Sequence, residues 1–520
     1  MQHSILIALL SLTLAGSPAF AAEEAKAPAA DKSAAEAPPP EPRAQRTQHE
    51  LRLNGQVLKY TATVGWLILN DKKTDAPIAR FGYIAYTLDG VSDAKRRPIT
   101  FAFNGGPGSA SIWLHMGALG PRRVVVNDGG FAPPPPVQLV DNDYSILDAT
   151  DLVMIDPVGT GFSKPVGDAK GEQFWGVDQD IESVGDFIRR YVTENGRWGS
   201  PKYVLGESYG GVRGAGLADH LQSKLGMNLN GLILVSPYFG QVAGNDGMAI
   251  DLPHVLYLST LAATAWYYDA IPDKPASVGD YALEVERFAI DEYAPALLKG
   301  HAISPEEKQA MAEKLGRYTG TSTQYWLRAD LRVSHQQFLQ ELLRDRGLIA
   351  GRIDARFSGP SLNPLNAEMD YDPFFPAVGP AYTAAFREYL HTELKFDVPD
   401  NYVISGGLYN KWDWRHKQPG TDGDENGQVP VTNLIPALAN AMTMNPGLHL
   451  LIDQGYYDLA TPTGALKYNL DHLRLTPEAR ARIRVNMYDA GHMMYLHEPS
   501  GRKFRENVVG FIRETDRLTD

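Results

Sequence analysis

Residues 206–210 read Gly-Glu-Ser-Tyr-Gly and place Ser208 in the pattern Gly-x-Ser-x-Gly. This pattern is typical of a nucleophile elbow, in which a serine occupies a strained turn between a strand and a helix. Residues 202–205 have the length and the apolar content of a short buried strand, and residues 212–225 favour a helix. The local sequence therefore predicts a strand, a turn and a helix, with a nucleophilic serine at the turn.

A serine hydroxyl is a weak nucleophile at neutral pH and needs an adjacent base that a carboxylate orients. In the α/β-hydrolase fold the acid and then the histidine follow the serine along the chain, each on a loop after a strand. Asp458 follows the apolar run 448–452, and His492 follows the run 483–488. We therefore predict that Ser208, Asp458 and His492 form a catalytic triad.

The same two loops contain alternative candidates for the acid and the base. His497 lies a few residues beyond His492 and is the second choice for the base. Asp453 would still lie at the strand end, whereas Asp458 can reach over the edge of the sheet. Asp489 precedes the histidine too closely to hold its ring from behind.

The oxyanion formed by attack on a carbonyl needs two N–H donors that are already in place. One should be the backbone N–H of Tyr209, the residue after the nucleophile. The second should come from residues 104–108, Asn-Gly-Gly-Pro-Gly, which follow the predicted strand 99–103. Glycines there would let the backbone approach a substrate closely; a plain glycine-rich turn is the alternative reading.

Composition excludes several other kinds of chemistry. The chain has 520 residues and no cysteine, so disulfides, cysteine-ligated zinc and thiol catalysis are excluded. Its formal net charge of −13, with no run of lysine or arginine, argues against a nucleic-acid partner. Residues 422–427 resemble the start of a calcium loop, but Asn433 occupies the position of its last ligand, so we expect a solvated acidic turn. We expect no metal and no cofactor.

The N-terminus predicts export. Residues 5–15 form a short apolar stretch, and Ala-Phe-Ala at 19–21 matches a signal-peptidase site. We expect residues 1–21 to be a cleaved signal peptide, with a periplasmic or secreted protein and no integral membrane segment after cleavage; an unusual membrane anchor is the alternative. Residues 22–48, rich in alanine and proline, are expected to be a disordered tether.

The remaining chain predicts an α/β fold with an insertion. Asn54-Gly55 between alternating apolar runs indicates a tight hairpin and an antiparallel start to the sheet. Further strands are expected at 99–103, 152–155, 203–205, 232–235, 448–452 and 483–488, and such continuous apolar runs are typical of a mostly parallel sheet covered on both faces. We expect a core at 49–240 and 401–520, and a helical cap at 241–400.

Two helices of the cap have recognisable starts. Ser304 and Pro305 begin one, with Gly316 as a plausible stop, and Ser334 begins another before Gly347. The cap also contains an aromatic cluster that could line a substrate pocket, although core packing is the commoner role. Its members are Trp266, Tyr267, Tyr268, Tyr325 and Trp326.

Four segments in order resemble the signature blocks of the serine carboxypeptidase family. They are Asn-Gly-Gly-Pro-Gly-Ser-Ala-Ser from 104, Asp-Pro-Val-Gly-Thr-Gly-Phe-Ser from 156, Gly-Glu-Ser-Tyr-Gly-Gly from 206 and Ala-Gly-His-Met from 490. The likeness extends from about residue 50 to the end, and the insertion looks like that of the bacterial branch. It implies an α/β-hydrolase that removes C-terminal residues from peptides through the same triad.

The resemblance also implies roles for residues around the serine. It assigns the second oxyanion donor to Gly106, and it gives Asn104 and Glu207 a part in binding the terminal carboxylate of the substrate. For Glu207 to donate a hydrogen bond it must be protonated, which a second carboxylate nearby would favour. We therefore expect peptidase activity to be highest below neutral pH.

Three positions depart from the family pattern. Ala102 stands where the family usually has tryptophan, and Ala118 where it usually has glutamate, so part of the carboxylate-binding network is missing. Ser109 stands in place of the family's cysteine. These departures leave the triad intact, but they make an esterase or acyltransferase that uses the same residues the alternative function.

Overall fold

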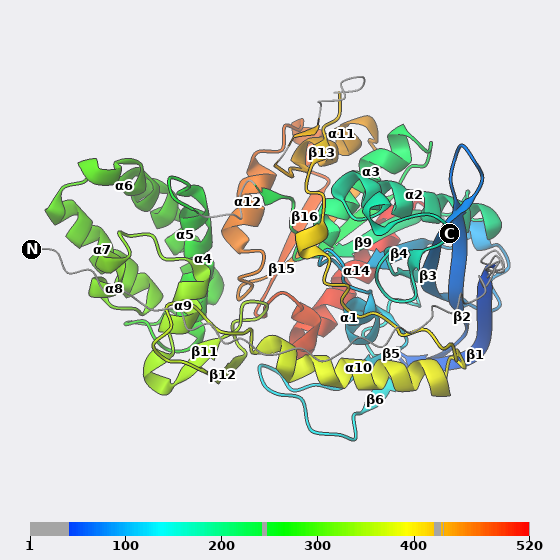
Figure 1. Cartoon of the computed structure of the whole chain (residues 1–520), viewed down its shortest axis with the longest axis horizontal. Helices are drawn as coiled ribbons and strands as arrows, with labels where there is room; N and C mark the ends of the chain where they lie inside the picture. Colours follow the sequence, from blue (N-terminus) through cyan, green and yellow to red (C-terminus); the bar gives the residue numbers. More distant parts are fainter. Residues whose placement is uncertain (1–40, 242–246, 421–427, 430, 519–520) are drawn as a thin grey trace, which may run out of the picture. The chain divides into compact units, whose positions relative to one another are not determined.

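The computed structural model describes residues 41–241, 247–429 without 421–427, and 431–518 (Figure 1). The expected signal peptide, most of the expected tether and most of the calcium-like turn at 422–433 lie outside these residues. Within the described ranges, none of the helices combines the length and the apolar character needed to span a bilayer.

A ten-stranded sheet forms the centre of the fold, in the order β1-β2-β3-β7-β4-β9-β10-β15-β16 with β8 (Lys164–Pro165) beside β3. The first three strands and β7 pair antiparallel, and the strands from β7 to β16 pair parallel. All six strands predicted after the hairpin are present. The bounds are β1 (Arg43–Leu53), β2 (Gln56–Asn70), β3 (Pro77–Leu88), β7 (Asp151–Ile155), β4 (Ile99–Phe103), β9 (Lys202–Glu207), β10 (Gly231–Val235), β15 (His449–Gly455) and β16 (Ile483–Tyr488).

The N-terminal hairpin turns at Asn54 and Gly55, as predicted. Both residues have positive φ, 51° and 76°, which is the backbone of the tight two-residue turn that matches strand twist. Strand β1 starts at Arg43, so residues 43–48, expected to belong to the tether, form part of the sheet. They pair with β2 in unbroken register, and these main-chain bonds order a polar segment that has little apolar surface to bury.

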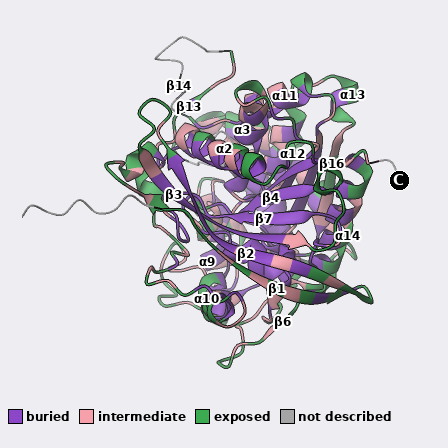
Figure 2. Ribbon diagram, turned by 90° about the vertical axis from the view of Figure 1, so that its right-hand side faces the viewer, coloured by how far each residue is buried: buried purple, intermediate pink, exposed green. Residues whose placement is uncertain are grey.

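Helices cover both faces of the sheet, and alternate side chains of β4 point to the two layers of helices. Phe101 and Phe103 pack with α2 (Val177–Glu194), α3 (Gly210–Ser223) and α11 (Ile435–Met444). Ala102 points to the opposite face, where α1 (Ile112–Leu114), α10 (Phe374–Thr392) and α14 (Glu498–Thr515) pack. Strands β4 and β7 are fully buried (Figure 2), as expected for parallel strands covered on both sides.

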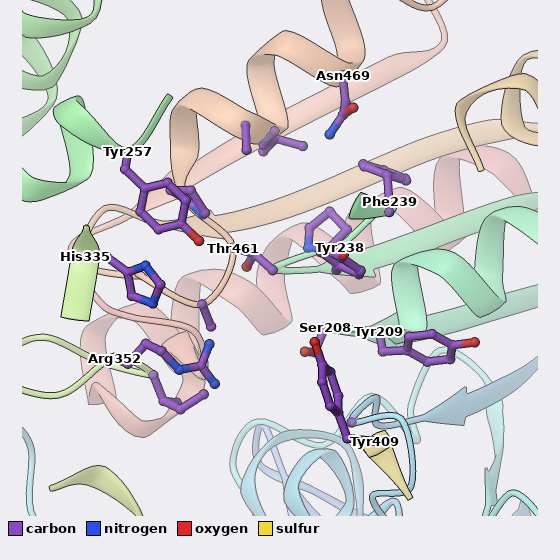
Figure 3. Close-up of a pocket in the computed structure, with 18 of the residues that line it drawn as sticks. Ser208, Tyr209, Tyr238, Phe239, Tyr257, His335, Arg352, Tyr409, Thr461 and Asn469 are labelled. Carbon is purple, nitrogen blue, oxygen red and sulfur yellow. The ribbon is translucent and has the colours of Figure 1, made fainter. Parts of the chain in front are cut away.

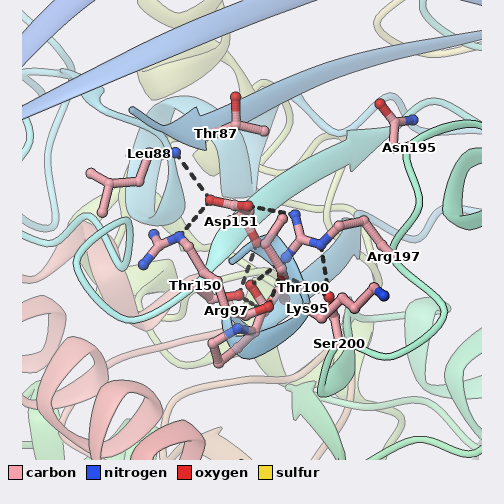
Figure 4. A network of polar contacts seen from close by, with 12 residues as sticks. Thr87, Leu88, Lys95, Arg97, Thr100, Thr150, Asp151, Asn195, Arg197 and Ser200 are labelled. Atoms are coloured by element: carbon pink, nitrogen blue, oxygen red, sulfur yellow. Dashed lines mark hydrogen bonds and ion pairs between the residues drawn. The ribbon is translucent and has the colours of Figure 1, made fainter. Parts of the chain in front are cut away.

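A buried charge cluster secures the start of the parallel strands (Figure 4). Asp151, the first residue of β7, accepts hydrogen bonds at 2.6 Å from Nε of Arg97 and at 2.6 Å from Nη1 of Arg197. The backbone N–H of Leu88 donates to the same carboxylate at 3.0 Å. A buried carboxylate is tolerated only when it is paired and hydrogen-bonded in this way. The cluster lies at the strand ends opposite to the one that Ser208 follows.

The insertion divides into two parts rather than forming the single cap expected at 241–400. Helices α4 to α9 enclose a hydrophobic core of their own, which also takes up Tyr457 and Leu459 from the loop after β15. Helix α10 instead packs against the sheet, with Tyr382 and Phe386 in the core on that side. The helices of the first part are α4 (Leu252–Tyr267), α5 (Val278–Phe288), α6 (Ala294–Leu298), α7 (Pro305–Thr319), α8 (Thr323–Arg328) and α9 (His335–Glu341).

Helix starts in the insertion are as predicted, but the stops are not. The Ser304 side chain accepts from the N–H of Glu307 at the start of α7, and Ser334 forms a capping box at the start of α9. Helix α7 continues through Gly316 and ends at Thr319, and the next residue, Gly320, has the left-handed conformation of a C-cap. Gly347 follows a separate short turn of 3₁₀ helix rather than α9 itself.

Candidate active site

Ser208 lies on a sharp turn between β9 and α3, as the sequence predicts. Its φ is 64°, a left-handed conformation that a residue with a Cβ adopts only under strain. A Cβ at Gly206 would lie 2.4 Å from the carbonyl oxygen of Gly210, so glycine is required there. The N–H of Ser208 donates to the carbonyl of Val235 at 3.0 Å, which ties the turn to the end of β10.

Asp458 and His492 form a hydrogen-bonded pair. Nδ1 of His492 lies 2.8 Å from Oδ2 of Asp458, and both side chains are buried. The carboxylate is held by further donors, among them the N–H of Ala460 at 2.9 Å and the hydroxyl of Thr461 at 2.6 Å. Burial acts to lower the pKa of His492, but the charge and hydrogen bond of Asp458 outweigh it and raise the pKa. An imidazole held in this way is suited to accept a proton.

Main-chain and side-chain contacts connect this pair to the serine turn. The hydroxyl of Ser236, the residue after Val235, donates to the carbonyl of His492 at 2.8 Å. Thr461 lies 3.3 Å from Nδ1 of His492 and lines the same cavity as Ser208. The loops that carry the three predicted triad residues therefore meet at one edge of the sheet.

The alternative candidates are engaged elsewhere. Nδ1 of His497 lies 2.8 Å from the hydroxyl of Ser500, at the start of α14. Asp453 accepts a hydrogen bond at 2.7 Å from the hydroxyl of Tyr488 and another at 2.9 Å from Asn486, within β15 and β16. No hydrogen bond or ion pair joins His497 to Asp458, or Asp453 to His492.

Two backbone amides beside Ser208 are available to a ligand. Gly106 and Tyr209 both line the cavity that contains Ser208. Among the described residues, no acceptor takes a hydrogen bond from either N–H. The two loops approach closely because residue 105 is glycine: a Cβ there would lie 2.4 Å from the nitrogen of Tyr209. A pair of oxyanion donors needs two unengaged N–H groups near the nucleophile.

The cavity above Ser208 has a volume of about 660 Å³ (Figure 3). Gly106, Ser208 and Tyr209 line it from the sheet side, and Tyr257, His335 and Arg352 line it from the insertion. The rings of Tyr257 and His335 stack with centroids 4.9 Å apart. None of the five aromatic residues singled out in the sequence lines this cavity, and Trp326 is buried in the core of the insertion.

Asn104 and Glu207 lie beneath the serine turn and contact each other. Nδ2 of Asn104 donates to Oε1 of Glu207 at 2.6 Å, and the hydroxyl of Tyr495 donates to Oε2 at 2.7 Å. Each of the two is 1% exposed, and neither lines the cavity. Burial is the main cause that raises the pKa of Glu207 to about 7. The charge of a second carboxylate, Asp458, raises this pKa only slightly. The main cause is therefore burial and not the neighbouring carboxylate that was expected from the sequence.

Two tyrosines pack beside the segment in which the family glutamate is replaced by Ala118. A Cβ at Gly117 would lie 2.5 Å from the hydroxyl of Tyr382 and 2.5 Å from the ring of Tyr495. Sequence reasoning missed Tyr495 as the partner of Glu207, although it follows His492 within the same loop. The side chain from this region that contacts Glu207 is therefore the hydroxyl of Tyr495.

Within the described residues, no group of three or more His, Asp or Glu side chains is arranged to hold a metal ion. The predicted acidic turn at 422–427 lies outside them.

Residues 83–264 match the family model described as "Serine carboxypeptidase". Over this segment the chain is similar to the serine carboxypeptidase family. The matched segment includes Asn104 and Ser208, whereas Asp458 and His492 lie beyond it.

Two curated relatives come from Arabidopsis thaliana. "Serine carboxypeptidase-like 36" is 29% identical over 177 residues, 33% of this chain and 34% of the relative. "Serine carboxypeptidase-like 29" is 28% identical over 138 residues, 24% of this chain and 25% of the relative. The matched region therefore spans about a third of the first relative and a quarter of the second.

Among solved structures, Kex1Δp, a prohormone-processing carboxypeptidase from Saccharomyces cerevisiae, superposes with a TM-score of 0.54. It is 16% identical, and the alignment covers 88% of this chain and 92% of that chain. At this identity the likeness establishes the fold, an α/β-hydrolase fold with a mostly parallel sheet, antiparallel N-terminal strands and a helical insertion.

Proposed function

We propose that this protein is a serine-type carboxypeptidase that releases C-terminal residues from peptides. The observation that carries the proposal is the buried Asp458–His492 hydrogen bond, which is connected through Ser236 and Val235 to the strained turn of Ser208. The match of residues 83–264 to the serine carboxypeptidase model and the two available amides at Gly106 and Tyr209 support it.

The proposed reaction follows from these positions. Ser208 Oγ attacks the scissile carbonyl while Nε2 of His492 takes its proton, and Nδ1–H of His492 donates to Asp458. The N–H groups of Gly106 and Tyr209 bind the oxyanion. His492 then protonates the leaving amine, and water hydrolyses the acyl-enzyme by the same route in reverse.

Carboxylate recognition by Asn104 and Glu207 is part of the proposal. With a pKa of about 7, Glu207 is protonated in mildly acidic solution and can donate a hydrogen bond to an anionic group. Binding there exchanges the Asn104–Glu207 hydrogen bond for bonds to the substrate. We expect peptidase activity to be highest below neutral pH; a rate that rises steadily from pH 5 to pH 8 would contradict this.

An esterase or acyltransferase that uses the same triad is the second candidate. Ala102 and Ala118 remove two expected parts of the carboxylate network, and Asn104 and Glu207 do not line the cavity. The two functions differ in their need for a free carboxylate. A carboxypeptidase cleaves an N-blocked dipeptide far faster than its C-terminal amide, whereas an esterase cleaves neither but accepts a simple aryl ester.

Labelling with a fluorophosphonate followed by peptide mapping tests the nucleophile. We expect a single modification on Ser208, and its loss in the variant Ser208→Ala. Labelling at another serine, or equal labelling of the variant, would refute the assignment.

We also propose that the protein is exported to the periplasm or beyond, on the basis of the N-terminal apolar stretch and the Ala-Phe-Ala site. Mass spectrometry of the native protein should then find an N-terminus at Ala22, whereas an intact Met1 would refute the export proposal.

A further inference from the structure

The wall of the cavity that faces Ser208 carries a positive charge. Arg352 lines the cavity from the insertion, and its guanidinium points across the cavity toward Ser208 (Figure 3). Among the described residues that line the cavity, none is aspartate or glutamate. This is unexpected in a chain with a net charge of −13. The lining therefore favours an anionic ligand over a cationic one.

The backbone beside Arg352 is fixed to both triad loops. The carbonyl of Arg352 accepts from the N–H of Leu459, the residue after Asp458, at 3.0 Å. The carbonyl of the next residue, Ile353, accepts from the N–H of His492 at 2.8 Å. The pKa of His492 responds to the charge of Arg352, which acts to lower it. Arg352 is thus held at a set position relative to the predicted base.

The side chain of Arg352 differs from that of its neighbour Arg356. Arg356 forms a buried ion pair with Asp354 at 2.7 Å and a second with Asp128 at 2.8 Å. For Arg352, by contrast, none of the described carboxylates forms an ion pair with the guanidinium; burial raises the pKa of the nearby Asp372, and the charge of Arg352 only partly opposes this. An arginine fork matches a carboxylate with two parallel hydrogen bonds. The side chain is therefore available to pair with a carboxylate that enters the cavity.

We propose that Arg352 binds a carboxylate of the substrate while Ser208 attacks it, and so determines which substrates the enzyme prefers. The inference rests on the proposed hydrolase function and extends it to the substrate class. The carboxylate is either the C-terminal α-carboxylate of a peptide or an acidic side chain next to the scissile bond. In the first case Arg352 does the work for which Ala102 and Ala118 leave the expected network incomplete.

The test compares Arg352→Gln and Arg352→Lys with Arg328→Gln, which removes one charge from an exposed position of the same insertion. Four substrates are used: an N-blocked dipeptide, its C-terminal amide, and aryl esters of N-blocked glutamate and glutamine. We expect Arg352→Gln to lower kcat/KM about 10- to 100-fold for one of the two carboxylate-bearing substrates, the free dipeptide or the glutamate ester, as for loss of a charge-assisted hydrogen bond. For the neutral glutamine ester, kcat/KM should change less than about twofold. Arg352→Lys should lower kcat/KM less than Arg352→Gln does, and the control Arg328→Gln should match the wild type.

The pattern of losses identifies the carboxylate. A loss confined to the free dipeptide indicates the α-carboxylate, and a loss confined to the glutamate ester indicates an acidic side chain. An equal loss for the neutral ester, or no loss for any substrate, would overturn the inference. Fluorophosphonate labelling separates failure of this inference from failure of the proposed function. If the activities overturn the inference but the Arg352 variants and the wild type label equally at Ser208, the nucleophile is confirmed and only the role of Arg352 is refuted.

Discussion

Glu207→Gln removes a buried group whose protonation state should make stability depend on pH. The raised pKa of Glu207 means that the folded state holds a proton which the unfolded chain releases between pH 4.5 and about 7. The stability from this group is therefore fully present below pH 4.5 and is lost as the pH rises through about 7. At 1.4 kcal/mol per pKa unit, the loss amounts to about 3 kcal/mol. Glutamine resembles the protonated form, because its oxygen can accept from Asn104 while its amide donates to the hydroxyl of Tyr495.

The assay is urea unfolding of the wild type and Glu207→Gln at pH 5 and at pH 8. Burial also raises the pKa values of Asp156 and Asp453, to about 6. Because both proteins contain these two residues, the difference in unfolding free energy between the proteins reports on Glu207 alone. We expect the free energy of unfolding of the variant, relative to the wild type, to rise by about 2–3 kcal/mol from pH 5 to pH 8. A difference that is the same at both pH values would show that Glu207 does not titrate in this window.

Two further substitutions test the site. Asp458→Asn should lower kcat about 10³- to 10⁴-fold with little change in KM, because an amide cannot hold His492 in the tautomer that accepts a proton from Ser208; steady-state kinetics measure this, and a loss below tenfold would argue against Asp458. Gly105→Ala should lower kcat about 10²- to 10³-fold, the cost of losing one oxyanion donor, since its Cβ would lie 2.4 Å from the nitrogen of Tyr209. Gly510→Ala, whose Cβ meets no atom within 4 Å, is the control and should retain full activity.

The strands and the elbow could be predicted because their signals are local. Six apolar runs became six parallel strands, and the Gly-x-Ser-x-Gly pattern produced the positive φ at Ser208. The stop of α7 was wrong because Gly316 packs inside the helix: a Cβ there would lie 2.8 Å from the carbonyl of Thr321, and Gly320 provides the left-handed cap instead. A glycine that is needed for space and one that is needed for conformation look the same in a sequence.

Contacts that join distant segments could not be predicted in the same way. Tyr495 donates to Glu207 across 288 positions of the chain. Helix α10 packs on the sheet through Tyr382 and Phe386, although its sequence is as helical as that of its neighbours in the insertion. Arg352 lines the cavity only because its turn is folded against two loops that come more than a hundred residues later. Such placements depend on packing between elements, which a single sequence does not encode locally.

The hydrogen bond between the carbonyl of Ile353 and the N–H of His492 joins the insertion directly to the loop of the proposed base. A shift of the 351–357 turn would either break that hydrogen bond or move the backbone of His492, and with it the imidazole. Exchanging the insertion for that of another hydrolase would therefore alter turnover as well as selectivity, so engineering of this region should keep the 351–357 turn together with the loops after β15 and β16 as a single unit.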